Sequence, residues 1–107
     1  MTTTAKRIIP GSVLTGSAST YYTAPSKAVV KSLTITNTTA AAVTATVYVV
    51  PLAGTAGASN CAINARPIAA NETYNCPELV NQVIETGGMI QAFGSGMTIM
   101  ASGVEIV

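Results

Sequence analysis

The sequence has little charge and lacks several residue types on which protein chemistry depends. Its 107 residues contain no histidine, no aspartate and no tryptophan, and only five Lys or Arg and four Glu. Charged residues therefore make up 8% of the chain, whereas an ordinary soluble domain carries about 25%. Because a free monomer usually covers its surface with mixed charges, this shortage predicts a surface that other protein subunits cover. A monomer kept in solution by neutral hydroxyl and amide groups is the alternative.

The same absences remove most catalytic and metal-binding chemistry. Without an imidazole, neither Cys61 nor Cys76 has the usual base that activates a thiol nucleophile, and no four-ligand zinc set can be assembled. The glutamates are spread over turns and the C-terminal segment, which offers no evident glycosidase pair; they are Glu72, Glu78, Glu85 and Glu105. The sequence therefore predicts no enzymatic activity, no cofactor and no metal. We expect the cysteines to be buried, unreactive thiols, with a disulfide between them as the alternative.

The positive charges and the apolar segments exclude two classes of partner. The cations are too few and too scattered to follow a phosphate backbone; they are Lys6, Arg7, Lys27, Lys31 and Arg66. The chain has no run of 18 apolar residues, and its start, MTTTAKR, lacks the apolar core of a signal peptide. We therefore expect neither a nucleic-acid nor a membrane partner, and synthesis in a cytoplasm.

Apolar residues recur with a period of two, which is typical of strands. Val29, Leu33 and Ile35 alternate with polar residues, with Lys31 as the exception. A second segment places Val43, Ala45, Val47 and Val49 on one face and Thr44, Thr46 and Tyr48 on the other. The six residues between these segments predict a hairpin.

The last third predicts a second hairpin, with a Gly-Ser-Gly turn at 94–96 between strands at 89–93 and 97–106. The final strand is apolar on both faces, with Ile99 and Ala101 on one side and Met100, Val104 and Ile106 on the other, unless a bulge near Gly103 changes the phase. Such a strand is either central or covered by a neighbour.

Seven or eight short strands separated by turn signals predict an all-β fold, a single-domain antiparallel β-sandwich of the jelly-roll or immunoglobulin-like kind. Residues 19–107 form this domain. Residues 1–18 are rich in Ser, Thr and Gly, and they form either an N-terminal arm held on a neighbouring subunit or a first strand of the sandwich itself. Few Lys or Pro are available to block the sheet edges, so we also expect a partner subunit to close them.

Six residues are predicted to contact other subunits: Ile8, Ile9, Tyr21, Tyr22, Thr44 and Thr46. Adjacent tyrosines at a strand commonly place one ring in the core and the other at an interface. An exposed aromatic platform that binds a sugar is the alternative for Tyr21 and Tyr22.

Several strings between Thr20 and Val107 carry a resemblance to a known group of proteins. They are YTAP from Tyr22, VKSLTITNTT from Val30, VTATVYVVP from Val43, IAANETY from Ile68, GGMIQAF from Gly87 and ASGVEI from Ala101. Together they resemble small bacteriophage proteins that are usually encoded among virion structural genes. The first 19 residues fall outside the resemblance.

The resemblance implies a virion protein without a catalytic centre, assembled in the bacterial host cytoplasm. We expect a homo-oligomer that packs against other virion proteins, such as capsid or neck subunits, as a capsid decoration or cement protein or as a head–tail neck accessory. A receptor- or glycan-binding module of a tail appendage is the alternative.

Overall fold

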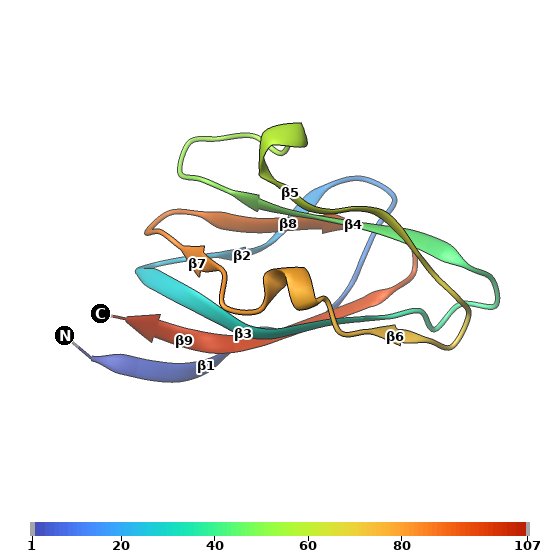
Figure 1. Ribbon diagram of the computed structural model, residues 1–107, viewed down its shortest axis with the longest axis horizontal. Helices are drawn as coiled ribbons and strands as arrows, with labels where there is room; N and C mark the ends of the chain where they lie inside the picture. Colours follow the sequence, from blue (N-terminus) through green and yellow to red (C-terminus); the bar gives the residue numbers. More distant parts are fainter. Residues whose placement is uncertain (1, 107) are drawn as a thin grey trace.

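Two antiparallel sheets pack face to face in the computed structural model, which describes residues 2–106 (Figure 1). Over these residues the strands are β1 (Thr3–Val13), β2 (Ser19–Thr23), β3 (Lys27–Thr36), β4 (Val43–Val50), β5 (Cys61–Ile68), β6 (Thr73–Tyr74), β7 (Val83–Ile84), β8 (Met89–Phe93) and β9 (Thr98–Ile106). Two short 3-10 turns, η1 (Ala58–Asn60) and η2 (Pro77–Leu79), complete the elements. The predicted all-β sandwich is confirmed, and within 2–106 no helix is long and apolar enough to cross a membrane.

The strands divide between a five-stranded sheet A and a four-stranded sheet B. Sheet A has the order β1-β9-β3-β6, with β7 also paired to β3, and sheet B has the order β2-β8-β4-β5. The largest fully buried side chains lie between the layers and include Ile9, Leu33, Val47, Ile90 and Ile99. Burial of these apolar surfaces is the main stabilising contribution to the fold.

Both predicted hairpins are wrong, because in each of them the two strands lie in opposite layers of the sandwich. β3 and β4 lie in different sheets, and so do β8 and β9. The side chain of Asn37 fixes the first crossing: it is fully buried, donates to the carbonyls of Ala41 and Ile68, and accepts from the N–H of Thr39. In the second crossing, the Gly94 and Gly96 N–H groups donate to the carbonyls of residues 15 and 14, so the turn bonds to another segment.

The phase predicted for β3 is also wrong at its first half. A register shift between Val30 and Ser32 inserts Lys31 as an extra residue, so Ala28 and Val30 face the core and Val29 faces outward. The sequence suggested a bulge near Gly103 in β9, but the bulge lies in the neighbouring strand β3. β9 therefore keeps its alternation. A Cβ at Gly103 would lie 2.2 Å from the Val29 carbonyl oxygen, so only glycine fits opposite the bulge.

The N-terminal segment pairs with its own chain, as β1 runs antiparallel to β9 at the edge of sheet A. Register shifts after Lys6 and after Ile9 interrupt this pairing, and they allow the neighbouring side chains Ile8 and Ile9 both to be buried.

Two of the four sheet edges carry residues that block strand addition. β1 carries Lys6, Arg7 and Pro10 together with its two register shifts. At the edge of sheet B, β5 carries Arg66 and Pro67, and Ala65 has a φ of 50° that interrupts the extended backbone. Cations, prolines and bulges are the usual means of blocking strand addition. Three of the five cations therefore lie on edge strands, whereas the β2 edge of sheet B, STYYT, carries no Lys, Arg or Pro and is left for a partner to close.

Candidate interaction surface

The four glutamates are held by different partners in four places. Glu72 accepts from the Ala69 N–H at 3.2 Å and Glu78 from the Tyr74 hydroxyl at 2.7 and 2.8 Å. Glu85 lies 3.5 Å from the Lys27 ammonium, whereas Glu105 lies in a separate cluster. No group of three or more potential metal ligands occurs within residues 2–106. The described carboxylates therefore form no shared acid–base site.

A cluster of the buried Tyr22 and Glu105 with the exposed Lys6 joins the two sheets on the side where β1 and β2 lie. The Tyr22 hydroxyl, from sheet B, donates to Glu105 Oε2 of sheet A at 2.6 Å, and Lys6 Nζ donates to the same oxygen at 3.3 Å. The hydrogen bond from Tyr22, together with Lys6, holds the pKa of Glu105 below its ordinary value against the effect of burial. Burial, reinforced by Glu105, raises the pKa of Tyr22. The cluster stabilises the ionised carboxylate inside the fold.

A more exposed cluster of Arg66, Tyr74 and Glu78 occupies the opposite side, where β5 and β6 lie. The Arg66 guanidinium lies 4.3 Å from the centre of the Tyr74 ring, and the Tyr74 hydroxyl donates to Glu78. Burial and Glu78 raise the pKa of Tyr74. Arg66 belongs to sheet B and Tyr74 to sheet A, so this cluster also spans the layers.

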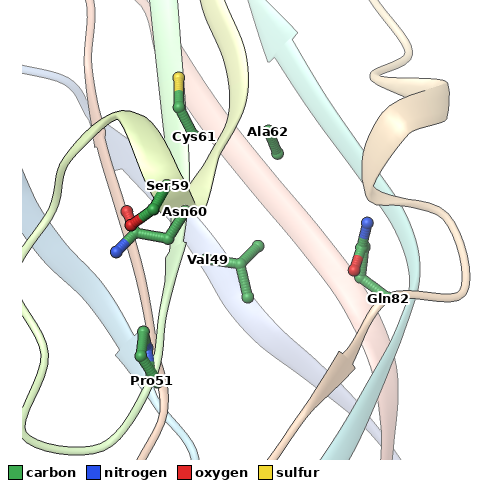
Figure 2. Close-up of a pocket in the computed structure, with 7 residues that line it drawn as sticks. All are labelled: Val49, Pro51, Ser59, Asn60, Cys61, Ala62 and Gln82. Atoms are coloured by element: carbon green, nitrogen blue, oxygen red, sulfur yellow. The ribbon is translucent and has the colours of Figure 1, made fainter.

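A groove of about 440 Å³ opens between β4 and β5 on one side and the segment before β7 on the other (Figure 2). Val49 and Ala62 form its apolar part, and the remaining lining residues are Pro51, Ser59, Asn60, Cys61 and Gln82. Most of its polar groups are already bonded: Asn60 donates to the Thr55 carbonyl and accepts from the Gly57 N–H, and Gln82 donates to the Glu78 carbonyl. We interpret the groove as the open seam between the two layers.

Both cysteines are free thiols. Cys76 is buried, and burial raises its pKa to about 12, so it stays protonated near neutral pH. Cys61 is half-buried and donates to the Ile63 carbonyl at 3.2 Å.

The outer face of sheet A carries a continuous apolar row. The strand register places Ala5 of β1 beside Val104 of β9, Val104 beside Val29 of β3, and Val29 beside Val83 of β7. These four residues, here called the valine row, share one face because directly paired residues of antiparallel strands point the same way. Val83 is 50% exposed, and Val104 and Val29 are half-buried.

Further apolar groups extend this face along the same sheet. Met100 follows on β9 and is 43% exposed, and Val13, which pairs with Thr98 at the end of β1, is 64% exposed. Cations flank the row on this face: Lys27 pairs with Glu85, Lys31 keeps its charge and donates to the Asn81 amide oxygen, and the Arg7 guanidinium contacts the Met100 sulfur. The outer face of sheet A thus carries apolar side chains from β1, β9, β3 and β7.

The six predicted contact residues are divided by the fold. Ile8, Ile9, Tyr22 and Thr46 are buried inside the chain itself, and the Thr46 hydroxyl accepts from the Ala65 N–H at the β5 irregularity. Tyr21 is half-buried and Thr44 is exposed. Only these last two reach the surface of the folded chain, and the structure does not bring them together with the valine row.

The sequence pattern missed the valine row for a definable reason. The bulge at Lys31 turned Val29 outward, although simple alternation placed it in the core. One feature of the sequence did point to the row, because the final strand is apolar on both faces. Its outward residues Val104 and Ile106 are the ones for which that pattern predicts a covering neighbour.

No protein-family model matches the chain, and no curated protein matches it. Among solved structures, it is similar to a chain in the structure of the infectious bursal disease virus Gx strain, with a TM-score of 0.48 and 18% identity. For the Gt strain of the same virus the TM-score is 0.46 and the identity 16%. Each match covers 96% of this chain and 30% of the viral chain. At these TM-scores the likeness carries no argument about function.

Proposed function

We propose that this chain is a non-enzymatic structural protein of a bacteriophage virion, either a capsid decoration or cement subunit or a neck accessory. It acts by packing against copies of itself and against other virion proteins such as capsid or neck subunits. The phage setting follows from the sequence resemblance between residues 20 and 107, and the packing role from the charge pattern and the surface.

The observation that carries the proposal is the valine row on the outer face of sheet A. Removing a half-exposed apolar row from water is favourable by about 25 cal/mol of free energy for each Å² of apolar area that is buried. Only nine of the 107 residues are charged, and several of these lie on the edge strands or in the two tyrosine clusters. The row itself contains no charged residue, although Lys27, Lys31 and Arg7 flank it, and an apolar row of this kind favours a protein cover.

The proposal is tested by removing the apolar character of the face without disturbing the core. Val83→Lys combined with Val104→Lys places two charges on the outer face, and Thr44→Lys combined with Thr20→Lys adds the same charges to exposed positions of sheet B. We expect the first pair to lower the number of copies on purified particles about tenfold or more, because two unpaired charges would be desolvated. Quantitative mass spectrometry of particles measures this number. Absence of the unaltered chain from particles, or undiminished incorporation of the sheet A variant, would overturn the proposal.

The alternative of a sugar platform at Tyr21 and Tyr22 is not supported by the geometry. Tyr22 is 7% exposed and its hydroxyl is bonded to Glu105, so the two rings do not form a shared exposed surface. A receptor-binding role would need another site.

A further inference from the structure

We infer that the outer face of sheet B carries a binding site for a neutral saccharide, beside the ring of Tyr48. This site lies on the opposite face from the valine row and is independent of the proposed packing role. If sheet A faces the particle, sheet B is left toward the surroundings.

The aromatic part of the site is a pair of rings on neighbouring strands. Tyr48 of β4 and Phe93 of β8 are both half-buried, and their ring centres lie 6.3 Å apart with the planes tilted by 32°. The strand register places both on the outer face, because Tyr48 pairs with Gln91 and Phe93 with Thr46 while Ile90 and Ala92 face the core. The neighbouring Phe93 ring limits the positions open to the Tyr48 ring.

A hollow of about 390 Å³ lies against Tyr48. Its other lining residues are Ala58, Cys61, Ala62 and Asn64. The irregular pairing of β4 with β5, in which Val47 faces Ile63 but Tyr48 faces Cys61, opens this space next to the ring. A volume of this size lies within the range of small-molecule sites, about 300 to 1,000 Å³.

The chemistry of the lining selects the ligand. Every residue of the hollow is uncharged, so no group there compensates the charge of a phosphate, a carboxylate or an amine. Within residues 2–106, neither the Tyr48 hydroxyl nor the Asn64 amide bonds to another protein group, so both are free to bond a ligand. An aromatic face beside a free amide and a free hydroxyl suits a ligand with one apolar face and a rim of hydroxyl groups. A pyranose ring has this form.

This chemistry separates the hollow from the groove of Figure 2 on the other side of Cys61. The groove has no aromatic lining residue, and its Asn60 and Gln82 amides are already bonded. The two spaces share Cys61 and Ala62 as a common wall. Of these two spaces, the sheet B hollow is the one that combines an aromatic face with free polar groups.

The site is tested by titrating the ¹⁵N-labelled protein with maltotriose, cellotriose and chitotriose and recording ¹H–¹⁵N spectra. We expect at least one of these to shift the amide signals of Tyr48, Ala62 and Asn64 with a dissociation constant in the millimolar range. Asn64→Ala, at an exposed position, and Tyr48→Ala are each expected to weaken this binding about tenfold or more. Tyr74→Ala is the matched control, because Tyr74 lies at the opposite layer edge and is engaged by Arg66 and Glu78.

The spectra also report folding, so a Tyr48→Ala protein that loses its dispersed signals is replaced by Tyr48→Leu, which keeps apolar bulk without the aromatic face. Three outcomes would overturn the inference: no shift with any of the three sugars, shifts confined to residues away from the hollow, or binding that persists in both the Tyr48 and Asn64 variants. Decaproline binding at the same residues without any sugar binding would also overturn it, in favour of a peptide site. Incorporation into particles has no bearing on any of these results.

Discussion

Each side of the sandwich holds a glutamate between a tyrosine hydroxyl and a cation, but the two glutamates differ in burial. On the β1–β2 side, the Tyr22 hydroxyl donates to Glu105 beside Lys6, and on the β5–β6 side, the Tyr74 hydroxyl donates to Glu78 beside Arg66. The first carboxylate is buried and its tyrosine stands 83 positions away in the sequence. The second is exposed, and its tyrosine is only four positions away.

The difference shows that burial and sequence separation, rather than the residue types, decide what such a cluster contributes. A bond between distant segments constrains the sheets relative to each other, and a bond across four residues constrains one short loop. A buried carboxylate that loses its donor also keeps its full desolvation cost, whereas an exposed one regains water. The β1–β2 cluster is therefore expected to be the stabilising one.

The largest effect is expected from Tyr22→Phe, which removes the hydroxyl and keeps the ring. Glu105 then loses its closest donor inside the fold, at a cost of about 2 to 3 kcal/mol in the free energy of unfolding. Urea denaturation of the wild type and the variant measures this difference. A cost no greater than that of Tyr74→Phe would show that burial of the first cluster does not matter.

A smaller effect is expected from pH. Because the pKa of Glu105 is lowered in the folded state, the carboxylate contributes stability above its unfolded pKa of about 4.3, and this contribution is lost as the pH falls through the folded value. Glu105→Gln keeps the shape without the charge, so it is expected to be less stable than the wild type by about 1 kcal/mol at pH 7.

The gap between these two proteins should close as the pH falls toward 3. Thermal unfolding at intervals between pH 7 and pH 3 measures the gap. A gap that stays constant across this range would contradict the ionised state of Glu105 in the folded chain.

The sequence allowed the strands to be located but did not allow their partners or the inward position of Glu105 to be predicted. Alternation in 43–50 reports which side chains share a face, and β4 is found at those residues. Alternation says nothing about which strand lies next to it, because a six-residue connection can close a hairpin or cross between layers. The single extra residue Lys31 reverses the phase of β3, and in the sequence it shows only as one exception to the alternation, which does not distinguish a bulge from an exposed lysine.

The candidate surfaces show the same limit. The low charge indicated that some surface would be covered, but the valine row depends on the pairing of four strands, including the two-residue β7. The free Asn64 amide beside Tyr48 depends on an irregular register between β4 and β5. Both features arise from long-range pairing, which residue periodicity does not encode.

The next smaller effects are expected from removing the two cations. Lys6→Met keeps the apolar stem but removes one donor from Glu105, and the Lys6 side chain is 49% exposed, so water screens its charge. We expect a loss of about 0.5 to 1 kcal/mol. Arg66→Met removes the contact with the exposed face of Tyr74 and is expected to cost about 0.5 kcal/mol. Added salt should reduce both losses, and urea denaturation at low and high salt measures them. A loss for Arg66→Met well above that for Lys6→Met would reverse the ranking of the two sides.

The smallest effect is expected from Tyr74→Phe, and it isolates the hydroxyl that the two clusters have in common. The ring that Arg66 contacts remains, while the two hydrogen bonds to Glu78 are lost. Because Glu78 is exposed, water replaces the lost donor and the free energy of unfolding should fall by no more than about 0.5 kcal/mol. Combining Tyr74→Phe with Tyr22→Phe should give the sum of the separate costs, since the two clusters share no residue and lie on opposite sides of the sandwich. A double variant that departs from this sum would mean that the two sides are coupled through the sheets between them.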